Sequence, residues 1–302
     1  MRDRDRLILA GMGLLLAAGL AAAETSTTSG APTRRPTESA AAAPAAGAAF
    51  DLSHAAWDKL LKERVRDGRV DYRGLKADSK ALDDYLSSIA AAPPRLYSDW
   101  SREDQLAFWI NVYNALTLRA VLDHYPIKPS WLMSLRYPKN SIRQIPGVWD
   151  RLRFRVLGKD MTLDEIENGV LRKTLREPRA HMALVCASLG CPSLRGEAYV
   201  SARLRNQLDE QAILFLRDSS KFHVERREGR VYLSRIFKWF AKDFIPNYEP
   251  SAGFEGPAPG TRAALNFIAR YIADDDARFV IAGGYEVLHL DYDWSLNEVA
   301  AK

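Results

Sequence analysis

The feature that most constrains the fold is one stretch without a charged side, from Ser101 to Asp123 (SREDQLAFWINVYNALTLRAVLD). Ser101 followed by Asp104 predicts a helix start, because both side chains can satisfy free backbone N–H groups. Apolar residues recur at helical spacing along one face, and the opposite face carries more apolar residues. A helix that is apolar all round is buried over most of its surface. We therefore expect this helix to lie at the centre of the domain.

Two amides interrupt this apolar helix. Asn111 and Asn114 are three residues apart, which places them on one side of the helix. A buried amide without partners costs about 1–3 kcal/mol, so both side chains should bind something. They either clamp a neighbouring loop or face a pocket as ligand-binding groups. The proline-punctuated stretch 125–149 could supply the carbonyl partners.

The N-terminal residues predict export. Three arginines precede an apolar run, and Ala21 and Ala23 form an A-x-A cleavage site, so residues 1–23 are interpreted as a signal peptide. An uncleaved anchor is the alternative. Residues 24–49 are rich in Ala, Pro and Thr and predict a disordered linker. A single globular domain should span residues 50–302, in an extracytoplasmic, periplasmic or secreted protein.

Helical patterns dominate this domain. The expected strands are short and scattered, at 154–156, 181–186, a hairpin near 222–233, and closing extended pieces at 279–283 and 286–294. Residues 236–244 read as one amphipathic helix. Because strict strand–helix–strand alternation is missing, the sequence predicts an α+β fold: a mostly helical domain around the central helix with a small mixed or antiparallel sheet.

Charge and motifs exclude several functions. The net charge of +5 is spread along the chain, with acids among the bases, so nucleic acid is not an expected partner. The expected partner is a small-molecule or peptide ligand, and membrane contact is expected only through an uncleaved N-terminal segment. Phosphate-loop, dinucleotide and zinc-protease spacings are absent from the sequence, so no cofactor and no metal is predicted.

The only two cysteines, Cys186 and Cys191, favour a disulfide in an exported chain. Such a bond would fix the loop around Ser188, which we consider a binding residue. A reactive thiol pair, a single nucleophile, or a metal site completed by His181 and Glu167 are the alternatives.

His181 is the candidate base for a cysteine nucleophile, although residues 181 and 186 of a regular strand point to opposite faces. A strand-edge histidine bonded to a carbonyl is the structural alternative. Glu167 is a candidate catalytic carboxylate, or else a surface group paired with Arg172 or Lys173.

Asp291 is a further candidate for binding. Asp291 and Asp293 would share one face of a closing strand, where paired carboxylates act as acid and base or bind a cation. The structural alternative is a strand that only caps the domain.

Several stretches together resemble family 547 of the domains of unknown function. They lie in order between residues 95 and 297 and include FWINVYNALTLRAVL, TLDEIENGVLR, PRAHMALVCASLGCPSLR, SRIFKWFAKDF and LDYDWSLN. The resemblance implies that Asn111, Asn114, Glu167, His181, Cys186, Cys191, Asp291 and Trp294 fall on motif positions. It implies no settled activity. Its plant members, some joined to glutaredoxin-like domains, slightly favour thiol chemistry.

Two hypotheses follow. The first is an exported enzyme, a hydrolase or thiol-dependent transferase with its site at the loop from His181 to Cys191. The second is a non-catalytic envelope binding or structural protein in which the Cys186–Cys191 disulfide is structural.

Overall fold

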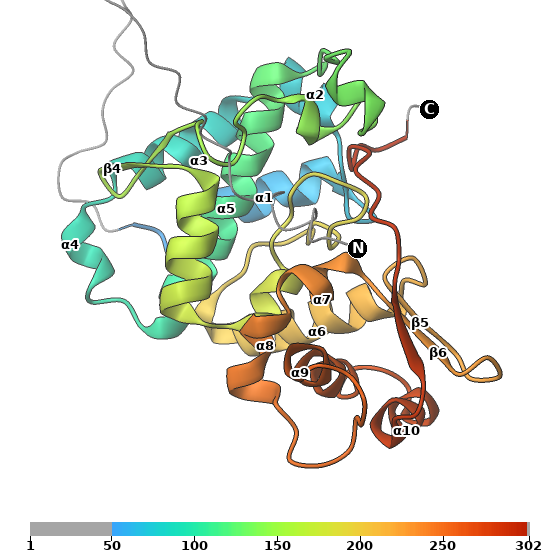
Figure 1. Cartoon of the computed structure of the whole chain (residues 1–302). Coiled ribbons are helices and arrows are strands. Elements are labelled where there is room, and N and C mark those ends of the chain that lie inside the picture. The colour runs from blue at the N-terminus through green and yellow to red at the C-terminus, as the bar shows by residue number, and fades with distance from the viewer. Residues whose placement is uncertain (1–49, 301–302) are drawn as a thin grey trace, which may run out of the picture.

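The computed structural model describes residues 50–300, and the expected signal peptide and linker lie outside them. The described chain is an α+β domain whose N-terminal helices form the upper half of Figure 1 and whose C-terminal helices form the lower half. The last segment, dark red in Figure 1, runs from the lower half along the upper half. This segment ties the halves together, since Glu286–His289 pairs with a C-terminal strand and Glu298 bridges to Val70.

The central helix α5 (Arg102–His124) forms as expected. The Ser101 hydroxyl accepts the Asp104 N–H at 3.0 Å, and every side chain from Leu106 to Leu118 is buried. The surrounding helices are α1 (Ala55–Arg64), α2 (Tyr72–Ala77), α3 (Lys80–Ala91) and α4 (Pro94–Tyr97). Two short hairpins complete this half, β1 (Val65–Arg66) with β2 (Arg69–Val70) and β3 (Phe154–Val156) with β4 (Lys159–Met161).

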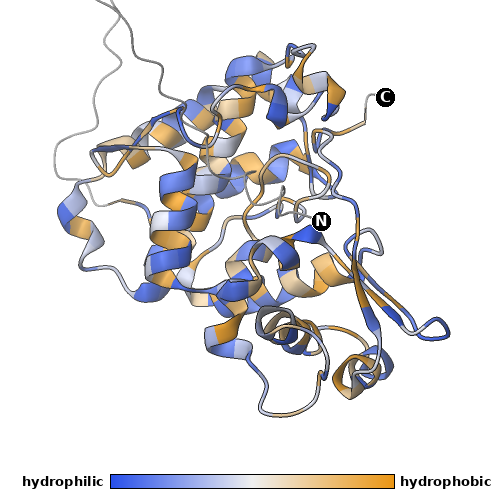
Figure 2. Cartoon of the chain, in the orientation of Figure 1, coloured by the Kyte–Doolittle hydropathy of each residue, from blue (hydrophilic) through white to orange (hydrophobic). Residues whose placement is uncertain are grey.

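A second hydrophobic core fills the C-terminal half. Its helices are α6 (Leu204–Arg217), preceded by η6 (Ser201–Arg203), then α7 (Arg235–Trp239), α8 (Ala241–Tyr248), α9 (Pro259–Ile268) and α10 (Asp274–Ala282). Strand β6 (Arg230–Leu233) pairs antiparallel with β5 (Phe222–Glu225) and parallel with β7 (Glu286–His289), which gives the small mixed sheet. Figure 2 shows the tip of the β5–β6 hairpin as hydrophilic, as its arginines and glutamate require.

Helix η4 (Glu165–Leu175) packs against α5 and has the wide turns of a π-helix. Its start is a capping box, in which Thr162 N–H donates to Glu165 and Glu165 N–H donates to Thr162 Oγ1. The helix ends at Arg176 in the left-handed region. Wide π-helical turns frequently occur at functional sites.

The expected strand at 181–186 is wrong. Pro178 opens the 3₁₀ turn η5 (Pro178–Met182), and the residues after it lie along α5. There Asn114 Nδ2 donates to Ala183 O at 3.0 Å, and Val185 N–H donates to Asn114 Oδ1 at 2.9 Å. One side-chain amide thus takes the place of the hydrogen bonds of a partner strand. Because residues 181–186 are not a regular strand, His181 and Cys186 are not required to point to opposite faces.

Two other expected elements also differ. Residues 236–244 form two helices, because Phe240 leaves the helical conformation between α7 and α8. Residues 279–282 belong to α10 rather than to an extended piece, and three aspartates in the first turn favour that helix start.

The irregular stretch 125–149 contains only the 3₁₀ turns η2 (Met133–Leu135) and η3 (Ile142–Gln144). Within residues 50–300, we find no helix with the length and apolar character to cross a lipid bilayer.

Candidate functional site

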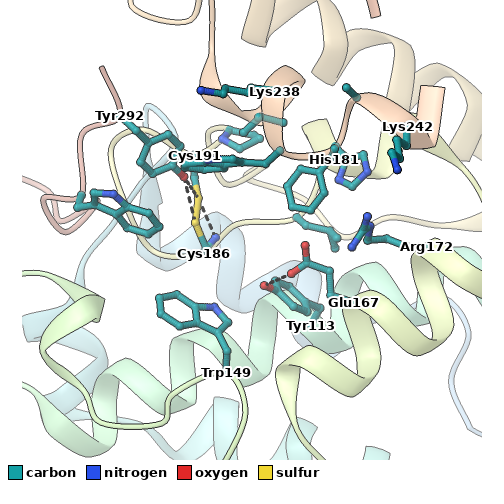
Figure 3. A pocket seen from close by; sticks show the side chains of 17 residues that line it. Tyr113, Trp149, Glu167, Arg172, His181, Cys186, Cys191, Lys238, Lys242 and Tyr292 are labelled. Atoms are coloured by element: carbon teal, nitrogen blue, oxygen red, sulfur yellow. Dashed lines mark hydrogen bonds between the residues drawn. A yellow bond between two sulfur atoms is a disulfide. The ribbon is translucent and has the colours of Figure 1, made fainter. Parts of the chain in front are cut away.

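A cavity of about 410 Å³ lies where the two halves meet. Its walls come from α5, η4, the loop 184–192, helices α7 and α8, and the C-terminal segment, as Figure 3 shows. This volume falls within the range of small-molecule sites. Six aromatic side chains line the cavity, those of Tyr113, Trp149, Trp239, Phe240, Tyr292 and Trp294.

The disulfide forms part of this wall. Cys186 and Cys191 are bonded with an S–S length of 2.06 Å, which confirms the favoured pairing. The Tyr292 hydroxyl donates toward the sulfurs of Cys186 and Cys191, at 3.2 and 3.0 Å. The backbone N–H groups of Leu189 and Gly190 donate to the C-terminal segment. Because both sulfurs are bonded, neither offers a thiolate nucleophile in this state.

Glu167 reaches the cavity from η4 and is only 8% exposed. The Tyr113 hydroxyl donates to its Oε2 at 2.8 Å. Burial raises the pKa of Glu167 and outweighs this hydrogen bond and the nearby positive charge, both of which lower it. The carboxyl is therefore not the surface ion-pair group that the helix pattern also allowed. It is placed to hold a proton at higher pH than an ordinary glutamate.

His181 lies in η5 and lines the same cavity. Its ring stacks on Phe240 with a centroid distance of 4.2 Å, and its Nε2 lies 2.9 Å from Asp243 Oδ2. Within residues 50–300, Nδ1 has no hydrogen-bond partner. A proton donated from Nε2 to Asp243 leaves Nδ1 as a proton acceptor.

Asp243 was not found by sequence reasoning. It lies on α8, and Arg172 Nε donates to its Oδ2 at 2.6 Å. Burial alone would raise the pKa of Asp243, but the hydrogen bonds from His181 and Arg172 outweigh it and lower the pKa to about 2. The sequence contains one indication of a role for Asp243, namely that it lies in the SRIFKWFAKDF stretch, which resembles the family.

Basic side chains also line the cavity. Lys238, Arg172 and Lys242 line it, and the two lysines are exposed. Arg172 also lies over the Phe240 ring, 4.8 Å from the ring centroid. A second cavity of about 160 Å³ adjoins the first and shares Arg172, His181, Leu184 and Lys242 with it.

The two asparagines bind backbone. Asn111 Nδ2 donates to Tyr199 O at 2.7 Å, and Tyr199 N–H donates to Asn111 Oδ1 at 3.0 Å. Asn114 holds Ala183 and Val185 in the same way. Neither amide lines the cavity, and residues 125–149 do not supply their partners. They position the loops that carry the site.

Ser188 and Asp291 also lie outside the cavity lining. Ser188 is buried and donates to the Tyr292 hydroxyl at 3.1 Å, so it supports the disulfide wall. The expected face of paired carboxylates is wrong, because β7 ends at His289. Asp291 pairs with Arg235 and is fully exposed, while Asp293 accepts the Ser295 N–H.

No three His, Cys, Asp or Glu side chains converge as a metal site within residues 50–300. The carboxyl of Glu167, the phenol of Tyr113 and the imidazole of His181 are groups that can give or take a proton, and all three line the cavity.

Comparison with known proteins gives one result. Residues 97–216 match the family described as "Protein of unknown function, DUF547". This match supports the family that the sequence resembles, and it includes Glu167, His181 and both cysteines. It is shorter than the expected 95–297 and leaves out Asp243 and Tyr292. No curated protein and no solved structure matches the chain.

Proposed function

We propose that this chain, with its DUF547 match, is a hydrolase that cleaves small ester or amide substrates in the aromatic cavity. One observation carries the proposal: a buried carboxyl with a raised pKa and an imidazole fixed by Asp243 line the same cavity. Active sites are where burial and charged neighbours shift carboxyl pKa values apart.

The proposed reaction uses each group once. His181 Nδ1 takes a proton from water, and the resulting hydroxide attacks the substrate carbonyl. Protonated Glu167 gives its proton to the leaving oxygen or nitrogen as the carbon–heteroatom bond breaks. The proton on His181 then returns to Glu167 through solvent. The net reaction consumes one water and releases an acid and an alcohol or amine.

The cavity also suggests a substrate class. Aromatic walls fit an aryl or acyl group, and Lys238, Arg172 and Lys242 fit a negatively charged end. The closed disulfide holds one wall in place. The thiol-dependent transferase that the sequence also allowed would require reduction of this bond before either sulfur could react.

The test is a panel of chromogenic aryl and acyl esters and amides, with and without a carboxylate. Glu167→Gln and His181→Ala should each lower kcat about 100- to 10,000-fold. Glu63→Gln on the exposed face of α1 and His223→Ala on β5 are matched controls and should leave kcat unchanged. Equal turnover by all four variants would overturn the proposal.

The second candidate is a binding protein without catalysis. It is favoured by the bonded cysteines and by the aromatic wall, which need no reaction to explain them. Binding of aryl carboxylates without turnover, equally in wild type and Glu167→Gln, would select it.

We also propose that the protein is exported and works outside the cytoplasm. The apolar run near the N-terminus and the Cys186–Cys191 disulfide support this location. Mass measurement of the chain from each cell fraction tests it. A mature chain that begins near Glu24 is expected, and an intact Met1 in the cytoplasmic fraction would contradict it.

A further inference from the structure

The stretch 125–149 exposes apolar side chains to an unusual degree. Among residues 50–300, the three most exposed large apolar side chains are Trp131 (78%), Leu135 (72%) and Leu132 (59%). Single exposed apolar residues are common, but a cluster of them on one short segment marks an interaction surface.

These three side chains share one face. Ser134 N–H donates to Ser130 O and Tyr137 N–H donates to Met133 O, so the segment is a turn of helix. In a helical turn, residues three or four positions apart are neighbours, so Leu135 lies beside both Leu132 and Trp131.

The side chain of Gln144 fixes the backbone of this segment. Gln144 is buried, its Oε1 accepts the Ser130 N–H at 2.9 Å, and its Nε2 donates to Ser134 Oγ and Pro138 O. The backbone that carries the three exposed apolar side chains is therefore fixed by hydrogen bonds.

The same stretch is basic. Between residues 125 and 149 there are four Lys or Arg residues and no Asp or Glu. Lys128, Arg136 and Lys139 are exposed, and none of the three makes an ion pair within the part of the chain that the structure describes. Apolar and aromatic side chains flanked by basic ones are typical of segments that enter the lipid headgroup region.

We propose that this surface, defined by Trp131, Leu132 and Leu135 with Lys128, Arg136 and Lys139, docks the domain onto an anionic lipid bilayer. The three apolar side chains enter the boundary between headgroups and acyl chains, and the basic side chains meet lipid phosphates. A second copy of the chain is a poorer occupant, because a twofold interface would set identical positive surfaces against each other.

The position of the segment connects it to the cavity. Arg143 lies over the rings of Tyr137, Trp149 and Trp294, and the last two of these line the cavity. A docked domain would thus hold its cavity close to the membrane surface.

The first experiment places an environment-sensitive fluorophore on the full chain at Leu132→Cys. Leu214→Cys on α6, another exposed leucine, is the matched control. Without reductant, the disulfide keeps Cys186 and Cys191 from reacting. With phosphatidylcholine vesicles containing phosphatidylglycerol, we expect a blue shift and quenching by lipid-borne quenchers at position 132 only.

Attachment through the N-terminal apolar run would recruit both labelled chains alike, so only the difference between positions reports this surface. Equal responses at both positions, or none at position 132, would overturn the proposal. A dimer that Leu132→Ser dissociates, with no response to vesicles, would assign the surface to a second copy and overturn it as well.

The second experiment tests the charges. Lys128→Gln, Arg136→Gln and Lys139→Gln combined should weaken binding to anionic vesicles about 100-fold, since each basic residue contributes about fivefold near such a surface. Lys59→Gln, Arg205→Gln and Arg227→Gln combined remove the same charge elsewhere and should change binding far less. Equal loss with both triple variants would show attraction by net charge alone and contradict the proposal.

Discussion

Glu167 and Asp243 share two neighbours, His181 and Arg172, yet the pKa values of the two carboxyls are shifted in opposite directions. Burial dominates at Glu167 and raises its pKa, whereas direct hydrogen bonds from His181 and Arg172 lower the pKa of Asp243 to about 2. The direction of each pKa shift depends on which groups form hydrogen bonds with the carboxyl, and not on which groups only lie near it. Within residues 50–300, Glu167 hydrogen-bonds only to the Tyr113 hydroxyl, while Asp243 hydrogen-bonds to the Arg172 guanidinium and the His181 ring.

This contrast assigns different roles to two similar groups. A carboxyl that resists ionisation can donate a proton, and one that is fully ionised can fix an imidazole. An amide resembles a protonated acid but not a carboxylate, so position 167 should tolerate Gln better than position 243 tolerates Asn. The following predictions test whether the two groups differ in this way.

The largest effect is expected in catalysis by Asp243→Asn. The amide cannot hold His181 in the tautomer that leaves Nδ1 as an acceptor, so kcat should fall about 1,000-fold while KM changes little. Steady-state kinetics on the best substrate of the ester and amide panel measure this. Asp276→Asn, at another partly exposed aspartate paired with an arginine, is the control. An unchanged kcat would remove Asp243 from the site.

The second largest effect is expected on the free energy of unfolding near neutral pH. Asp243→Asn loses charge-assisted hydrogen bonds and should lower the free energy of unfolding by about 2 kcal/mol. Glu167→Gln keeps the shape of the carboxyl and removes a group whose ionisation burial disfavours, so it should not lower the free energy of unfolding. Urea denaturation of both variants measures the difference. A larger loss at Glu167 than at Asp243 would reverse the comparison.

The pH dependence of stability should separate the two groups further. Because burial raises the pKa of Glu167 above its ordinary 4.5, its stabilising contribution is complete below that value and is lost as pH rises through the folded-state pKa. Glu167→Gln should therefore gain stability relative to wild type as the pH rises above 4.5. Asp243 acts in the opposite sense, since its contribution is complete above 3.8 and is lost as pH falls toward about 2.

Denaturation curves at several pH values check both signs. Glu63→Gln on the exposed face of α1 is the matched control for the loss of a glutamate carboxyl. A Glu167→Gln curve parallel to wild type would mean that Glu167 ionises normally in the folded protein.

The sequence alone does not predict most of this difference between Glu167 and Asp243. The central helix and the disulfide were predictable because each depends on residues close together in the chain. Asp243 meets His181 from 62 residues away, and no local pattern encodes that contact. The burial of Glu167 likewise depends on how η4 packs against α5.

The wrong strand at 181–186 has a related cause. Four consecutive apolar residues indicate burial, but they do not say what satisfies the backbone. Here the partner is the amide of Asn114, a side chain rather than another strand. The two asparagines were rightly expected to hold something, and what each holds depends on the tertiary fold.

The smallest effect should come from Tyr113→Phe, which removes the one hydrogen bond that favours ionised Glu167. The pKa of Glu167 should rise further, and stability near neutral pH should fall by about 0.5 kcal/mol, because the carboxyl loses a donor but keeps its burial. A ¹³C NMR titration of the glutamate carboxyl groups measures the pKa. Tyr199→Phe is the matched control, since the Tyr199 hydroxyl is buried and has no partner within residues 50–300. If Tyr113→Phe lowered the pKa of Glu167, the phenol would be stabilising the protonated acid, and the balance between burial and hydrogen bonding proposed for Glu167 would be wrong.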